Sequence, residues 1–134
     1  MLIDGNGVLH INKFGMACHV GVICDIPTIG VSKTLYQVFG LENNQYHKEK
    51  IKNLLKEQGD YFELISNEPV PSILGICYRS TSNSTNPIYV SIGNKISLNT
   101  CLWVIGLVTK SYRIPEPIRQ ADLKTREHLR KFIQ

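Results

Sequence analysis

The first 33 residues constrain the fold of this chain most, because their pattern predicts a strand, a helix and a second strand. Met1-Leu2-Ile3 is a short apolar segment, small for a core strand, and it leads directly into a turn cluster, Asp4-Gly5-Asn6-Gly7. Apolar residues then recur at helical spacing over residues 14–24, and residues 27–31 are typical of a short buried strand. This is a βαβ unit, whose strands should run parallel with a right-handed crossover.

The remaining pattern predicts more strands and helices around that unit. A polar segment with an apolar stripe predicts a surface helix that ends at Gly59, and Ser97 is a plausible N-cap for a later apolar helix. The expected elements are helices at residues 41–58, 97–110 and 119–132, and strands at 61–66, 73–79 and 88–92. We therefore expect one α/β domain over residues 1–134, with helices packed against a single mixed sheet.

Composition and length favour a packed globular domain. The chain has 134 residues, of which 43% are hydrophobic and 19% charged. Its four cysteines form no zinc-like or disulfide-like spacing, so we expect buried thiols in a reducing compartment. No apolar run reaches the roughly 18 residues of a membrane span, and no segment resembles a signal peptide. We expect an intracellular protein of the cytoplasm or nucleus, including the nucleolus, that does not engage a membrane.

Basic residues are concentrated near the end of the chain. Seven of the fifteen lysines and arginines fall between Lys110 and Lys131, where only three acids occur. An excess of positive charge suits a polyanionic partner, but a solvated helix face explains it equally well.

Two residues form the best candidate for a chemical site. Asp4 ends the first expected strand and Lys33 follows the second, so parallel strands would bring both to one edge of the sheet. Tetrapeptides such as that at Asp4 are usually ordinary turns, and a lysine in a loop is usually only solvated. His10 could donate to a phosphate, although a lone histidine is more often a surface residue. The residues alone thus indicate a metal or phosphate site near Asp4 and Lys33.

A longer run makes the assignment specific. Residues 4–33, DGNGVLHINKFGMACHVGVICDIPTIGVSK, resemble the endonuclease V family, in which D-G-[NH]-G, a histidine, a glycine-led helix and G-V-[AS]-K recur at this spacing. The segments LENNQYHKEKI, PIYVSIGNKISL and YRIPEPIRQADLKTREHLRK are similar to animal members of the family, so the resemblance covers nearly the whole chain.

The resemblance implies a partial RNase H-like fold and a metal-dependent endonuclease that uses Mg²⁺, with Mn²⁺ as an alternative. The expected substrate is single-stranded RNA containing inosine, or deaminated DNA in repair. Cleavage would leave a 3′-hydroxyl and a 5′-phosphate one nucleotide beyond the one adjacent to the deaminated base. Similarity to animal members favours RNA.

The resemblance also assigns roles to individual residues. The acid that matches Asp4 binds metal, the lysine that matches Lys33 contacts the scissile region, and the histidine that matches His10 lies near the substrate. The family's pocket for the flipped base is formed by backbone that matches four further positions. These positions are Gly7, Gly15, Met16 and Gly30.

Two departures from the family pattern bear on activity. Family members carry a long region before the block at Asp4, with an aspartate, a glutamate and an aromatic wedge, so we expect an N-terminally truncated member. Asn94 also stands where the family usually has histidine, and asparagine cannot exchange a proton near neutral pH. Of the eleven acids, only Asp4 matches a family ligand. The alternative function is therefore an inactive family member that only binds nucleic acid.

Overall fold

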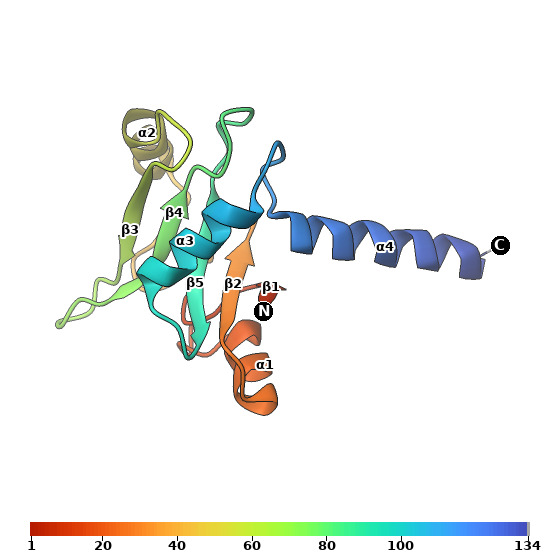
Figure 1. The fold of residues 1–134 in the computed structure, drawn as a ribbon. Coiled ribbons are helices and arrows are strands. Elements are labelled where there is room, and N and C mark those ends of the chain that lie inside the picture. The colour runs from red at the N-terminus through yellow and green to blue at the C-terminus, as the bar shows by residue number, and fades with distance from the viewer. Residues whose placement is uncertain (134) are drawn as a thin grey trace.

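The computed structural model describes residues 1–133 and shows one five-stranded mixed sheet with four helices (Figure 1). The sheet order is β1-β2-β5-β4-β3. The strands are β1 (Leu2–Asp4), β2 (Thr28–Ser32), β3 (Tyr61–Ile65), β4 (Ile73–Tyr78) and β5 (Ile88–Asn94), and the helices are α1 (Met16–Cys24), α2 (Gln45–Leu54), α3 (Leu98–Val108) and α4 (Glu116–Ile133). The expected α/β class with a mixed sheet is confirmed.

The N-terminal βαβ unit forms as the sequence predicts. β1 pairs with β2 in parallel, with Leu2 opposite Ile29 and Asp4 opposite Val31, and α1 makes the connection between them. Although β1 has only three residues, it is a real strand at the edge of the sheet. The helix begins later than expected, at Met16, because Gly15 is its extended N-cap residue.

The other strand pairs are antiparallel, and side chains alternate between two apolar cores. Ile88 and Val90 of β5 enter the core beneath α3, whereas Tyr89 enters the core on the opposite face. The first core also contains Ile118, the first buried side chain of α4. Both faces of the sheet are therefore covered, and α4 is docked at its start by one apolar contact.

Local side-chain bonds explain why α2 is shorter than residues 41–58. Asn44 accepts a hydrogen bond from the His47 N–H at 3.0 Å and so fixes the first turn. At the other end the Asp60 carboxylate accepts from the backbone N–H groups of Lys56 and Glu57, at 2.8 and 2.7 Å. These bonds replace helical ones, and the helix ends at Leu54 instead of reaching Gly59.

The last helix begins earlier than expected and projects from the body. Pro117 lies in the first turn of α4, where backbone N–H groups have no acceptor within the helix. The missing N–H of proline therefore costs no helical hydrogen bond, and α4 begins before Arg119. Figure 1 shows α4 extending away from the sheet, with the C-terminal end at its far tip. Three of its basic residues already pair with acids one turn away. These pairs are Arg119–Glu116, Arg126–Asp122 and Lys131–Glu127.

Three of the four free cysteines are buried, as expected, but Cys24 is exposed. Burial raises the pKa of Cys77 to about 12 and that of Cys101 to about 11, so both remain protonated thiols near neutral pH. Within residues 1–133, no helix has the length and apolar character needed to cross a bilayer.

Candidate active site

Asp4 and Lys33 meet at one edge of the sheet. Asp4 is the last residue of β1, and Lys33 directly follows β2, which runs parallel to it. Their side chains form an ion pair, with 3.6 Å between Lys33 Nζ and Asp4 Oδ2. The exposed fractions are 43% for the lysine side chain and 51% for the aspartate, so both charged groups remain open to a ligand. The predicted juxtaposition of these two residues is confirmed.

A second carboxylate lies at the same edge and was missed in the sequence analysis. Asp122 of α4 and Asp4 line one hollow of about 270 Å³, floored by Leu2 and Ile118. Asp122 also lines a neighbouring hollow of about 250 Å³ together with Lys33. Its carboxylate is 39% exposed and lies 3.2 Å from Arg126 Nε. The site therefore contains two carboxylates and one ammonium group.

Helical spacing indicates that Asp122 lies on the buried face of α4. It follows the buried Ile118 by four residues, and residues four apart lie on the same face of a helix. The face of α4 that contacts the body must therefore also present Asp122. The charge composition of this helix by itself indicates only a basic surface.

The glycines assigned to a base pocket make close backbone contacts with one another. A Cβ atom on Gly30 would lie 2.4 Å from the Gly7 nitrogen, and a Cβ on Gly15 would lie 2.4 Å from the Asn6 carbonyl oxygen. The Gly15 N–H donates to the Gly7 carbonyl at 2.9 Å. The Gly7 N–H donates to Ser91 Oγ at 2.8 Å. These contacts press the loop after β1 between β2 and the start of α1.

Met16 and His10 occupy different positions relative to this loop. Met16 begins α1 beside Gly5, and its side chain is largely exposed. The His10 ring stacks on Tyr36, with 5.2 Å between ring centroids, and its Nδ1 accepts from the Asn12 N–H. His10 lines neither the hollow that contains Asp4 nor the one that contains Lys33 and Asp122. The structure thus places Asp4, Lys33 and Asp122 together and leaves His10 outside the group.

Asn94 lies away from this group and has a structural role. It pairs with Thr28 at the start of β2, whereas Asp4 pairs with Val31 near the end, which separates them by roughly 10 Å along the strand. Its Nδ2 donates to the Gly21 carbonyl at 3.0 Å and to the Ile26 carbonyl at 3.1 Å. The Asn94 side chain therefore ties down the end of α1 in this chain.

The donor set fits a small divalent cation bound jointly with substrate. Among residues 1–133, no cluster of three or more histidine, cysteine, aspartate or glutamate side chains is placed to hold a metal. Mg²⁺, however, is usually bound by one or two carboxylates and completes its shell with water and substrate phosphates. Asp4 and Asp122 are such carboxylates on a shared hollow, so they are the residues that would hold the ion.

A comparison with known proteins identifies the class. The family model described as Endonuclease V matches residues 1–123. The chain is 50% identical to endonuclease V of Homo sapiens and 51% identical to that of Mus musculus, over 133 residues in each case. These alignments cover 99% of this chain, but 46% of the human protein and 38% of the mouse protein.

Solved structures give the same result. The crystal structure of human ENDOV superimposes with a TM-score of 0.93 at 48% identity, covering 99% of this chain and 54% of that chain. Endonuclease V of Ciona intestinalis, in complex with a 24mer DNA containing an inosine followed by a ribo-adenosine, gives 0.89 at 37% identity, with 98% and 54% covered. The fold is therefore the α/β fold of the solved endonuclease V structures.

The chain belongs to the endonuclease V family. It spans about half the length of the curated relatives that it matches.

Proposed function

We propose that this chain supplies part of the active site of a Mg²⁺-dependent endonuclease that hydrolyses inosine-containing single-stranded RNA. The meeting of Asp4, Lys33 and Asp122 at one sheet edge is the observation that carries this proposal. Family membership and the inosine-containing DNA bound by the Ciona relative support it. The identity with the human and mouse proteins favours an animal-type enzyme, and hence RNA over DNA as the substrate.

Each of the three residues has a distinct task in this proposal. Asp4 and Asp122 hold the divalent cation, with Mn²⁺ as an alternative to Mg²⁺; when bound, the ion stabilises negative charge on a phosphoryl oxygen. Lys33 balances the charge of Asp4 in the free protein and places a second positive charge against the scissile phosphate. In the hydrolysis, a water oxygen forms a bond to phosphorus, the bond to the 3′-oxygen breaks, and that oxygen takes up a proton.

The base pocket is a further part of the proposal. The backbone around Gly7, Gly15, Met16 and Gly30 would receive the flipped hypoxanthine, and His10 would lie near the strand. The close packing of this loop supports a preformed surface, because its backbone lies directly against Gly15 and Gly30, where no side chain would fit. We also propose that the protein works inside the cell, in the cytoplasm or nucleus, where its free cysteines remain reduced.

A second candidate function is nucleic-acid binding without cleavage. The observation that favours it is the small donor set, since two carboxylates are fewer than two-metal hydrolysis usually employs. Cleavage of a labelled single-stranded RNA with one inosine, in Mg²⁺, discriminates the two functions. The matched substrate has adenosine at that position.

The matched protein variants are Asp4→Asn and Asp25→Asn. Asp25 is an exposed acid that pairs with Lys95, away from the hollow at Asp4, so its loss should leave the rate unchanged. We expect cleavage of the inosine strand only, and its loss in Asp4→Asn alone. Binding of the inosine strand with no cleavage would instead support the second function, and equal cleavage of both strands would contradict the proposed specificity.

A further inference from the structure

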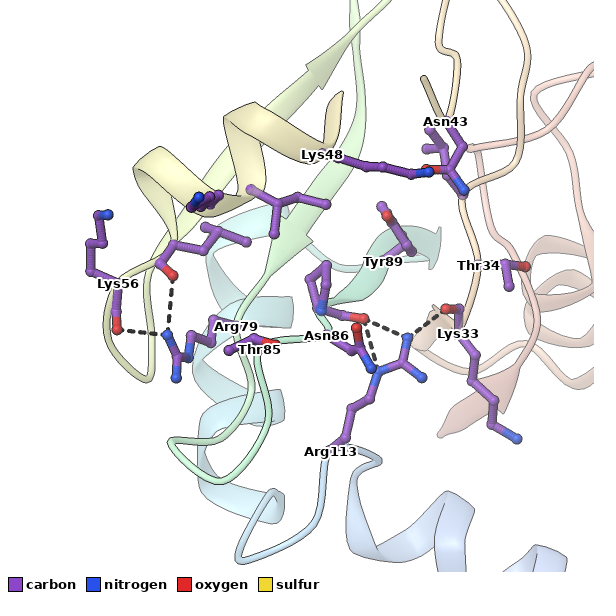
Figure 2. A pocket seen from close by; sticks show the side chains of 15 residues that line it. Lys33, Thr34, Asn43, Lys48, Lys56, Arg79, Thr85, Asn86, Tyr89 and Arg113 are labelled. Atoms are coloured by element: carbon purple, nitrogen blue, oxygen red, sulfur yellow. Dashed lines mark hydrogen bonds between the residues drawn. The ribbon is translucent and has the colours of Figure 1, made fainter. Parts of the chain in front are cut away.

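A larger hollow of about 690 Å³, which Lys33 lines but Asp4 does not, lies between α2, the loop after β2 and Arg113 (Figure 2). We call it the basic groove because every charged residue that lines it is positive. These residues are Lys33, Lys48, Lys52, Lys56, Arg79 and Arg113. Figure 2 shows the Lys48 side chain reaching from α2 towards Asn43, across the hollow.

The two arginines build the walls of the basic groove. Arg113 donates to the carbonyl oxygens of Pro87 and Lys33, and Arg79 donates to those of Leu55 and Lys56. Figure 2 shows both guanidinium groups held by these bonds. These bonds to backbone carbonyls hold the arginines in place, so they fix the shape of the groove while retaining their charge. Lys48, Lys52 and Lys56 add further positive charge to its lining.

Two lysines of the groove, Lys48 and Lys52, lie one turn apart on α2, and Lys56 follows just beyond its end. Like charges four residues apart in a helix, as at Lys48 and Lys52, repel each other and destabilise the helix. None of the ion pairs formed within residues 1–133 includes any of the three. An anion in the groove would relieve this repulsion.

The floor of the groove is apolar, which favours a nucleotide over a small inorganic anion. Leu35, Ile51 and Leu55 line it together with Tyr89, which is only 5% exposed. The Tyr89 hydroxyl is 3.0 Å from His47 Nε2, so the ring is fixed in place. Lysines along a hollow with an apolar floor suit single-stranded nucleic acid, whose successive phosphates need several cations.

The groove is continuous with the candidate active site through shared residues. Lys33 and Arg113 line both the basic groove and the hollow that contains Asp122. Asp122 and Ile118 line both that hollow and the one that contains Asp4. The basic groove therefore adjoins the candidate active site, with Lys33 and Arg113 at the boundary between the two hollows.

We propose that the basic groove binds the part of a single strand that flanks the cleavage site, through its phosphates and without regard to the inosine. The proposal rests on the proposed function, because it assumes that a nucleic-acid strand occupies the site at Asp4 and Lys33. It adds α2 to the binding surface and assigns Lys48 and Lys52 to the strand.

Lys48→Glu is the sharpest test, because it separates binding from folding. A glutamate at position 48 lies in the first turns of α2 and precedes Lys52 by four residues, the favourable order for an ion pair. The melting temperature of the variant should therefore stay the same or rise. Its affinity for RNA should fall by about tenfold, since one attractive charge becomes repulsive.

The matched control is Lys50→Glu on the same helix, which changes the net charge equally. Lys50 points away from the groove and lies 4.6 Å from the centroid of the Phe62 ring. Its reversal should leave RNA affinity unchanged. Lys52→Gln removes one groove cation without adding an anion, and should reduce the slope of log affinity against log salt by about 0.7.

Fluorescence anisotropy of the 134-residue chain, without divalent cations, measures these effects on two RNAs that differ only in inosine or adenosine. Equal weakening of both RNAs by Lys48→Glu, with none by Lys50→Glu, would support the groove. If Lys48→Glu and Lys52→Gln bind as the unmodified chain does, or if Lys50→Glu weakens binding as much, the proposal is wrong. If the unmodified chain bound both RNAs equally while the lysine variants still weakened binding, the proposed function would be wrong and the role of the groove would stand.

Discussion

Replacing Asn94 should destabilise the protein by an amount that its two hydrogen bonds predict. The side chain donates to the carbonyls of Gly21 and Ile26, which would otherwise lack these partners at the end of α1. Each bond contributes about 1 kcal/mol net, so Asn94→Ala should lower the free energy of unfolding by about 2 kcal/mol. For 134 residues the entropy of unfolding is about 0.28 kcal/mol/K, and the melting temperature should fall by about 7 °C.

The replacements at this position can be ranked by the donors that they retain. Neutral histidine offers one ring N–H where asparagine offers two donors, so Asn94→His should lose about half as much stability as Asn94→Ala. Asn94→Asp should be the worst, because a carboxylate would face two carbonyl oxygens. Thermal unfolding followed by circular dichroism measures all three.

Asn53→Ala is the control, since Asn53 is exposed in the last turn of α2, and it should change the melting temperature little. A melting temperature of Asn94→Ala equal to that of the unmodified chain would refute the structural role. A variant Asn94→His more stable than the unmodified chain would refute the donor argument.

Two further predictions concern the core and the glycine contacts. Burial, together with the positive charge of Lys50, lowers the pKa of His47 below its ordinary value of about 6.5, so the unfolded chain binds more protons just below that pH. The stability that neutral His47 contributes should be fully present above about pH 6.5 and be lost as pH falls towards the lowered pKa. Urea unfolding from pH 5 to 8 should show this fall in the free energy of unfolding. An equal pH dependence in His47→Gln would contradict the prediction. Gly30→Ala should lower the free energy of unfolding by about 3 kcal/mol or more, because its Cβ would lie 2.4 Å from the Gly7 nitrogen. Gly106→Ala in α3, whose Cβ would have only the Tyr78 hydroxyl nearby, at 3.6 Å, should raise it by about 0.5–1 kcal/mol. Similar melting temperatures for the two variants would show that the loop at Gly7 can shift to accept a methyl group.

The sequence predicts those parts of the site that depend on local pattern. The apolar segment, turn and helix before Thr28 indicate a βαβ unit, and parallel strands must place Asp4 and Lys33 at one edge. Helical spacing puts Asp122 on the same face of α4 as Ile118, but its place beside Asp4 depends on how α4 docks through Ile118. Docking is a tertiary contact that no local pattern specifies.

The ends of elements and the role of Asn94 show the same limit. The polar pattern of residues 41–58 permits a long helix, but side-chain bonds from Asn44 and Asp60 select a shorter one. A family pattern indicated that position 94 differs in this chain, but only the structure shows that Asn94 bonds to carbonyls at the far end of β2. Resemblance locates a substitution in the sequence, and its consequence depends on the surrounding contacts.

We expect Asp4 and Asp122 to hold one divalent cation together, and titration with Mn²⁺ measures this binding. Electron paramagnetic resonance of the free ion gives its affinity for the unmodified chain, Asp4→Asn, Asp122→Asn, the double variant and the control Asp25→Asn. Each single variant should weaken binding about tenfold or more, the double variant should be weaker by less than the product of the two effects, and the control should bind as the unmodified chain does. Binding by Asp122→Asn equal to that of the unmodified chain would contradict this expectation.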